Sequence, residues 1–180
     1  MAVTAAGARD FLPRIVRAGL AIAGTYAILH LVIPAALGID VVAALNRALA
    51  VASAALMNAA GFAVTRSDTV LTLHGASVVV TDDCNSVGAW LLVVGAMSAL
   101  PSIPWRWRLA GMAASAVTLT LVNVVRISVL SYLRAEQPQW FGPVHEQMFP
   151  LVVVLVASAC VVIWFTRVES AHHASTTMRL

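Results

Sequence analysis

The sequence predicts an all-α integral membrane protein with about four transmembrane helices, an extracytoplasmic interfacial helix and a short β-hairpin. Of its 180 residues, 61% are hydrophobic and only 11% are charged, which is too few polar side chains to cover a soluble domain. Several apolar runs approach or exceed the roughly 20 residues that cross a bilayer. These observations exclude a soluble globular enzyme, a disordered chain and a collagen-like chain.

Four apolar runs are predicted to cross the membrane within a single embedded domain, residues 1–180. The first run has three arginines before or near its start, at 9, 14 and 17, and is too long for the apolar region of a signal peptide. The second is close to the shortest length that spans a bilayer. The predicted spans are residues 15–37, 86–100, 109–133 and 148–165, followed by a cytoplasmic tail, 167–180, whose polar part we expect to fray.

The long connection between the first two spans, residues 38–85, is predicted to lie on the outer face of the membrane. Its first part, 41–64, is apolar and alanine-rich. At about 100° per residue its large apolar side chains form one stripe, and the polar side chains occupy a different arc, which is typical of an interfacial helix. These polar residues are Asn46, Arg47, Ser53 and Asn58. Residues 69–81, TVLTLHGASVVVT, predict a hairpin that turns at His74-Gly75.

The arginine distribution favours this topology. The chain has eleven arginines and no lysine, with a formal net charge of +3. With the N-terminus inside, seven arginines fall in cytoplasmic segments and four on the outer side or embedded near it, which obeys the positive-inside rule. A fifth span at 41–64 would place Arg106 and Arg108 outside. The charge excess is too small and dispersed to indicate nucleic-acid binding.

Three reactive side chains fall in one membrane layer on this topology. Cys84, in TDDCNSVGAW, stands at the outer start of the second span. Arg126, in NVVRISVL, lies about two turns inside the outer end of the third span, and His145, in GPVHEQMF, directly precedes the fourth. They are 42 and 19 residues apart in sequence, and packing of the spans could bring thiol, guanidinium and imidazole together.

Cys84 is the candidate nucleophile, because it is predicted to open a helix and because Arg126 or a protonated His145 could supply a cation that favours the thiolate. The alternative is a small buried hydrophobic residue at a helix start. Cys160 lies about 12 residues into the fourth span, far from the depth of Cys84. We therefore predict no disulfide and only a packing or lipid-facing role for Cys160.

Arg126 and His145 have the chemistry to assist Cys84. An arginine inside a span is costly unless it pairs, reaches the interface or lines a wet cavity, so a functional role is the default expectation. Its planar donors suit a developing oxyanion or a carboxylate, whereas the alternative is an interfacial anchor. His145 suits general acid and base chemistry, the alternative being a polar boundary residue.

Nearby polar residues are candidates for supporting or substrate-binding roles: Asp82, Asp83, Asn85, Asn123 and Glu146. The two aspartates could cap a helix, orient His145 or Arg126, or bind a basic feature of a substrate. Asn123 lies three residues before Arg126 on the same helical face and could orient it or add a donor. Adjacent helical residues point apart, which weakens Glu146 as a partner of His145. No metal-ligand cluster or phosphate loop is present, so we predict no metal and no cofactor.

The order of these motifs resembles the exosortase/archaeosortase family of membrane cysteine transpeptidases. A cysteine stands at the start of one span, N-x-x-R-I lies inside the next, and a histidine precedes the last. The resemblance covers Thr81 to about Phe165 and is closest to the exosortase H subgroup. The motifs that carry it are C-N-x-V-x-A at 84–89, P-x-x-P-W-R-W-R at 101–108, N-V-V-R-I at 123–127 and W-F-x-x-x-H at 140–145.

The resemblance implies that Cys84, Arg126 and His145 match the family's catalytic residues. It implies a multi-pass protein of the bacterial inner (cytoplasmic) membrane whose active site faces the periplasm or cell exterior. The implied substrates are exported proteins with a C-terminal short motif, of the I-P-T-L type in this subgroup, then a transmembrane helix and a basic cluster. They are cleaved through a cysteine thioester that an amine or water resolves.

Two features depart from the common family pattern. Asn85-Ser86 follows the cysteine where Ser-Gly is usual, and the chain lacks the accessory spans of larger members. A different class of function is the alternative: a non-catalytic membrane subunit or chaperone that binds a partner's transmembrane helix through Gly- and Ala-rich spans, with Arg126 as an ionic anchor.

Overall fold

The computed structural model describes residues 5–177, and the side chains of residues 11–170. Its helices are α1 Ala5–Ala27, α2 Ile33–Leu37, α3 Val41–Ala59, α4 Val87–Ser98, α5 Trp105–Glu136, α6 Pro138–Pro143 and α7 Phe149–Thr177. Two π-helical turns, η1 Ile28–Val32 and η3 Val144–Met148, join α1 to α2 and α6 to α7, so each pair forms one continuous helix. A 3₁₀ turn, η2, covers Asp82–Cys84.

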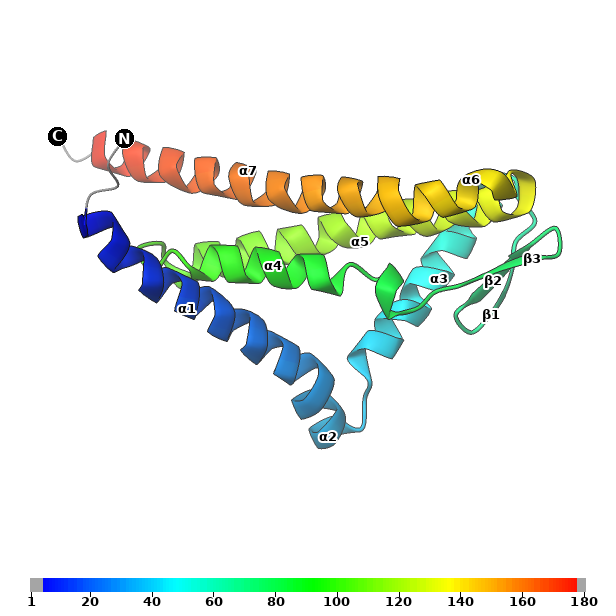
Figure 1. Cartoon of the computed structure of the whole chain (residues 1–180), viewed down its shortest axis with the longest axis horizontal. Helices are drawn as coiled ribbons and strands as arrows, with labels where there is room; N and C mark the ends of the chain where they lie inside the picture. The colour runs from blue at the N-terminus through cyan, green and yellow to red at the C-terminus, as the bar shows by residue number, and fades with distance from the viewer. Residues whose placement is uncertain (1–4, 178–180) are drawn as a thin grey trace.

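Helices α4, α5 and α7 run side by side, and α1 crosses α4 and then diverges from it (Figure 1). The start of α1 and the end of α7 lie at the same end of this bundle, and the β-sheet and α6 lie at the opposite end, called here the sheet end. Four helices are long and apolar enough to cross a membrane: 11–37, 41–59, 105–136 and 138–170. The predicted helical membrane fold is confirmed.

Helices α3 and α4 differ from the predicted spans. The predicted span 86–100 is a helix of only 12 residues, about 18 Å long at 1.5 Å per residue, whereas α3 has 19 residues. A hydrocarbon core is about 30 Å thick, so α4 covers only part of that depth and α5, with 32 residues, extends past it. The turn before α4 therefore lies partway along α5.

Helix α3 lies obliquely to α4, α5 and α7 and packs against α5 (Figure 1). The prediction that its polar residues share one arc away from the apolar stripe is wrong. Asn46 is 6% exposed and Ser53 is fully buried, whereas Arg47 and Asn58 are exposed. Asn46 and Ser53 can be buried because both form hydrogen bonds. The Ser53 hydroxyl donates to the Val124 carbonyl at 3.3 Å, and the Asn46 side chain donates to Asp82.

The predicted hairpin is confirmed as strands β2, Val70–Leu73, and β3, Ala76–Val79, which pair antiparallel. His74 and Gly75 both have positive φ, 48° and 82°, as a type I′ turn requires. A third strand, β1, Thr65–Ser67, was not predicted; it pairs with the far side of β2 and gives the order β1-β2-β3. His74 at the hairpin tip contacts Glu136, the last residue of α5, through an Nδ1 to Oε1 distance of 2.5 Å.

The predicted frayed tail is helical as far as it is described. Helix α7 continues to Thr177, well beyond the predicted end of the last span at residue 165, and residues 178–180 lie outside the described part.

Glycine permits the tightest helix contacts in the bundle. A Cβ on Gly111 of α5 would lie 2.4 Å from Trp164 Cδ1, so α5 and α7 approach closely only because residue 111 has no side chain.

Candidate active site

Cys84 ends the 3₁₀ turn between β3 and α4. Its N–H donates to the Thr81 carbonyl at 2.9 Å, and the Thr81 hydroxyl donates to its sulfur at 3.9 Å. The prediction that Cys84 opens a helix is wrong, because α4 begins at Val87 and Ser86 between them has a left-handed backbone, φ 53°. The hydroxyl that donates to the sulfur, on Thr81, is one that the sequence did not single out. Such a donor stabilises negative charge on sulfur.

A chain of amide hydrogen bonds fixes this turn against α3. The Asn85 side chain donates to Asn46 Oδ1 at 3.1 Å, and the Asn46 side chain donates to Asp82 Oδ1 at 2.7 Å. Asn85 Oδ1 also accepts from the Val87 N–H at 3.0 Å. The structure shows Asp82 bonded to Asn46, not capping a helix or contacting His145 or Arg126. Sequence reasoning missed Asn46, although its spacing from Val42 and Leu49 places it on the buried face of α3.

We expect Asn46→Leu to loosen the Cys84 turn. The substitution keeps a side chain of similar size but leaves the buried Asn85 amide without its partner, which costs about 1–3 kcal/mol, and it also removes the bond to the exposed Asp82. Thermal unfolding in detergent should shift to a lower temperature, and alkylation of Cys84 should change in rate. Arg47→Leu, at the exposed neighbouring position, is the matched control. An unchanged unfolding temperature and unchanged thiol reactivity in Asn46→Leu would argue against this positioning role.

Cys84 and His145 line the same cavity at the sheet end of the bundle. The cavity has a volume of about 320 Å³, and Asp83 also lines it. One wall is β3 and the turn that follows it, and the other walls are α5 and the helix formed by α6 and η3. The lining residues are Ser77, Val78, Val79, Val80, Thr81, Asp83, Cys84, Ile127, Leu130, Arg134, Phe141 and His145.

His145 is half-buried in the π-helical turn η3, with its ring stacked on Phe141 at a centroid distance of 5.5 Å. It does not precede the last helix, as predicted, but lies inside a continuous helix that begins at Pro138. Hydropathy alone misplaced this start, because the first turns contain Pro138, Gly142 and Pro143 and are still helical, with Pro138 at a first-turn position that tolerates proline. Glu146 is exposed and does not line the cavity.

Arg126 lies on α5 beside the cavity but is not one of its lining residues. The next residue, Ile127, lines the cavity. The Cζ atom of Arg126 is 5.9 Å from the centre of the ring of Phe149, a residue that lies one helical turn after His145. Arg126 is ten residues before the end of α5 at Glu136, about 15 Å at 1.5 Å per residue, which is deeper than the predicted two turns.

Arg126 and Asn123 hold hydrogen-bonding groups that nothing in the described part of the chain satisfies. Arg126 is 6% exposed and Asn123 is fully buried. The Nε atom of Arg126 and both side-chain amide atoms of Asn123 are buried without a hydrogen-bond partner. Most buried polar groups in folded proteins are paired, so these atoms represent unused donor and acceptor capacity on α5, the helix whose residue Ile127 lines the cavity.

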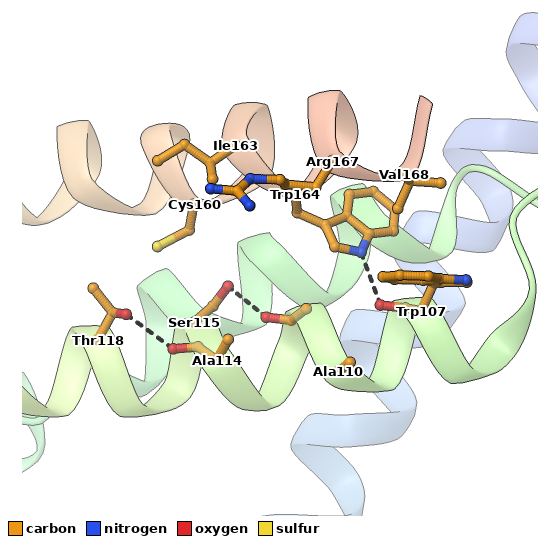
Figure 2. Close-up of a pocket in the computed structure, with 11 residues that line it drawn as sticks. Trp107, Ala110, Ala114, Ser115, Thr118, Cys160, Ile163, Trp164, Arg167 and Val168 are labelled. Atoms are coloured by element: carbon orange, nitrogen blue, oxygen red, sulfur yellow. Dashed lines mark hydrogen bonds between the residues drawn. The ribbon is translucent and has the colours of Figure 1, made fainter. Parts of the chain in front are cut away.

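Cys160 lines a different cavity, of about 410 Å³, between the first part of α5 and the later part of α7 (Figure 2). The hydroxyls of Ser115 and Thr118 in this cavity donate to carbonyls of their own helix at 2.8 and 2.9 Å. The Trp164 indole donates to the Trp107 carbonyl at 2.8 Å. Among residues 11–170, whose side chains the structure describes, no histidine or carboxylate lines this cavity, so these residues provide no base for the Cys160 thiol.

The chain was compared with protein families, curated proteins and solved structures. The family model described as transmembrane exosortase (Exosortase_EpsH) matches residues 14–164, most of the chain, and extends well upstream of the motifs at 84–145. No curated protein and no solved structure gave a match. The matched region includes the turn that holds Cys84, the buried Arg126 and the helix that carries His145. This chain belongs to the transmembrane exosortase family.

Proposed function

We propose that this chain is a membrane cysteine transpeptidase or protease that removes a C-terminal sorting signal from exported proteins. The observation that carries the proposal is that Cys84 and His145, 61 residues apart, line one cavity in a chain of the exosortase family. The Thr81 hydroxyl at 3.9 Å from the sulfur adds a donor for the thiolate. Cys160 is the matched cysteine for comparison, because the described side chains that line its cavity include no histidine or carboxylate.

In the proposed reaction His145 accepts the Cys84 proton, and the sulfur attacks the carbonyl carbon of the scissile peptide bond. A carbon–sulfur bond forms and the carbonyl oxygen becomes an oxyanion. When the intermediate collapses the carbon–nitrogen bond breaks, and His145 gives its proton to the leaving amine. The remaining thioester is attacked by an amine, forming a new amide bond, or by water, forming a carboxylate; in both cases the thiol is regenerated.

Arg126 and Asn123 are proposed to stabilise the oxyanion and orient the reacting group. Their buried, unpartnered nitrogen atoms are suited to a charge that exists only during the reaction, because a donor with no ground-state partner loses nothing when it binds the oxyanion. Asp82 and Asn85 are proposed to act indirectly, by holding the Cys84 turn through Asn46. Asp83, exposed at the cavity wall, is proposed to contact the substrate.

The proposed substrates are exported proteins with a C-terminal short motif, a transmembrane helix and a basic cluster. Cleavage is proposed at the outer face of the bacterial inner membrane. A substrate held in the bilayer by its own helix would present the adjoining segment near the membrane surface. The sheet end, which holds the cavity, would then face the periplasm or cell exterior.

Reconstitution tests whether the chain itself is the enzyme. Cells that lack the chain should accumulate exported precursors with an uncut C-terminal helix, and mass spectrometry of intact proteins would identify them. The purified chain and one such precursor are then combined in lipid vesicles. Cleavage by the chain alone supports the proposal, because a non-catalytic subunit or chaperone would leave the precursor intact. Accumulation in cells without cleavage by the purified chain would favour the non-catalytic alternative.

The proposed orientation makes a prediction about thiol labelling. A small membrane-impermeant thiosulfonate should label Cys84 in intact spheroplasts, because Cys84 borders a cavity at the sheet end, and should leave Cys160 unlabelled. Peptide mass spectrometry distinguishes the two sites. Cys84→Ser should lose the label and Cys160→Ser should keep it. Labelling of Cys84 only in inverted vesicles would show that the sheet end faces the cytoplasm.

A further inference from the structure

The free edge of strand β3 forms one wall of the cavity beside Cys84. The sheet order β1-β2-β3 leaves the outer side of β3 without a partner strand in the described part of the chain. Five consecutive residues, 77–81, line the cavity. A cavity over one face of a strand touches alternate residues, because side chains alternate between the two faces. Lining by consecutive residues indicates that the cavity opens along the backbone edge.

The strand register shows which backbone groups point toward this edge. The Val80 N–H donates to the Thr69 carbonyl at 2.9 Å, so the backbone of Val80 faces β2. In an antiparallel pair the hydrogen-bonding direction alternates along the strand, so Val78 also faces β2. Ser77 and Val79 therefore direct their N–H and C=O groups toward the free edge. These groups form a ready site for another extended chain.

Nothing in β3 blocks such pairing. Natural sheets protect exposed edges with proline, charged side chains, bulges or very short strands, whereas β3 reads Ala-Ser-Val-Val. The opposite edge is protected: β1 has only three residues and carries Arg66, whose guanidinium donates to the Asp68 carbonyl at 2.6 Å. The unprotected edge is the one that borders the cavity. Addition of a strand to an open sheet edge is a recurring mode of peptide recognition.

We infer that the substrate binds as an extended strand added to the free edge of β3, with its backbone bonded to Ser77 and Val79. This inference rests on the proposed function and specifies how the cavity holds its substrate. Strand β3 runs from the hairpin tip, which His74 and Glu136 fix to α5, directly into the turn that holds Cys84. A segment laid along β3 therefore ends with a peptide bond at the cysteine. Because this binding uses the peptide backbone, substrates with different side chains would bind in the same register.

Peptide chloromethyl ketones test this inference without a known substrate. The probe is acetyl-tetravaline chloromethyl ketone, applied to the purified wild-type chain in lipid vesicles. The Cys84 sulfur displaces chloride, forming a carbon–sulfur bond and releasing chloride and the thiol proton. A matched series carries one N-methyl group at each residue in turn. The rate of Cys84 modification is measured by peptide mass spectrometry.

We expect the effect of N-methylation to alternate along the probe. N-methylation where the probe's N–H points to β3 should slow modification about tenfold, since it removes one backbone hydrogen bond and adds a clash. N-methylation at intervening residues should change the rate less than about twofold. A uniform effect, or none, along the series would overturn strand addition.

Two proline variants give the matching test on the protein side. Val79→Pro removes an N–H at the free edge of β3 and should slow the peptide probe. Arg66→Pro removes the corresponding outward N–H at the opposite edge of the sheet and should leave the rate of modification by the probe unchanged. Equal slowing by both variants would overturn the inference. The N-methyl series on the wild-type chain decides the question even where a variant folds poorly.

Iodoacetamide separates this inference from the proposed function, because it alkylates thiols without offering a strand. Rapid alkylation of Cys84, relative to Cys160, combined with an alternating N-methyl effect supports both. Rapid alkylation without alternation overturns strand addition and leaves Cys84 as a nucleophile. A Cys84 that reacts no faster than Cys160 with either reagent would overturn the proposed function and this inference together.

Discussion

Replacing Cys84 with alanine is expected to abolish processing of the sorting-signal precursor while the protein remains folded in the membrane. The substitution removes the only thiol in the cavity, and loss of a nucleophile lowers rates by several orders of magnitude. The fold should tolerate it, because Cys84 is a small, 7% exposed member of an apolar cluster with Ile127 and Leu71. Gel mobility of the precursor and the amount of chain in the membrane measure the two effects.

Cys160→Ala is the matched control for this variant. Both cysteines line cavities, but among the described side chains a histidine lines only the cavity at Cys84, and a hydroxyl donates only to the Cys84 sulfur. Processing by Cys160→Ala should match that of the unmodified chain. Continued cleavage by Cys84→Ala, or equal loss in both variants, would refute the assignment of Cys84 as the nucleophile.

Arg126→Lys is expected to lower the processing rate about a hundredfold while leaving expression unchanged, as removal of one oxyanion donor typically does. An interfacial anchor needs only a positive charge on a flexible stem, which lysine supplies. An oxyanion clamp needs planar, directed donors, which lysine lacks. Processing is measured in single-turnover reactions of the purified chain. Wild-type activity in Arg126→Lys would support the anchor.

Arg126→Leu gives the complementary test. A buried arginine is costly in a membrane helix, so its removal should make the chain at least as abundant in the membrane, and activity should still vanish. Membrane abundance and activity would change in opposite directions only if Arg126 takes part in the reaction. Full activity in Arg126→Leu would remove this residue from the mechanism.

The hairpin and the long helices followed from local rules in the sequence. His74-Gly75 supports the positive φ angles of a tight turn, and uninterrupted apolar runs specify helices whatever their neighbours. Hydropathy misplaced the start of the last helix at residue 148, because the turns from Pro138, which contain two prolines and a glycine, are helical as well. It also overestimated the second span at both ends: α4 begins one residue later, after Ser86, whose αL backbone has no clear signal in a non-glycine residue, and it stops at Ser98, two residues before the predicted end.

The reactive residues of the candidate site were visible in the sequence, but their supports were not. Cysteine, membrane arginine and histidine stand out because each is chemically unusual where it occurs. Asn46 is held by partners 36 and 39 residues away, and Thr81 contributes a common hydroxyl, so only tertiary structure relates them to Cys84. The role of β3 as a cavity wall likewise depends on packing of the sheet against α5.

Cys84 is proposed to form a thioester with the substrate, and direct detection of this intermediate tests that proposal. The purified chain is mixed with precursor, quenched in acid within the first turnover, digested and analysed by mass spectrometry. We predict an acyl group on Cys84 whose mass equals that of the peptide ending at the cleavage site, and hydroxylamine should release it. Cleavage of the precursor with Cys84 unmodified at every time point, or with the acyl group on another residue, would contradict the account.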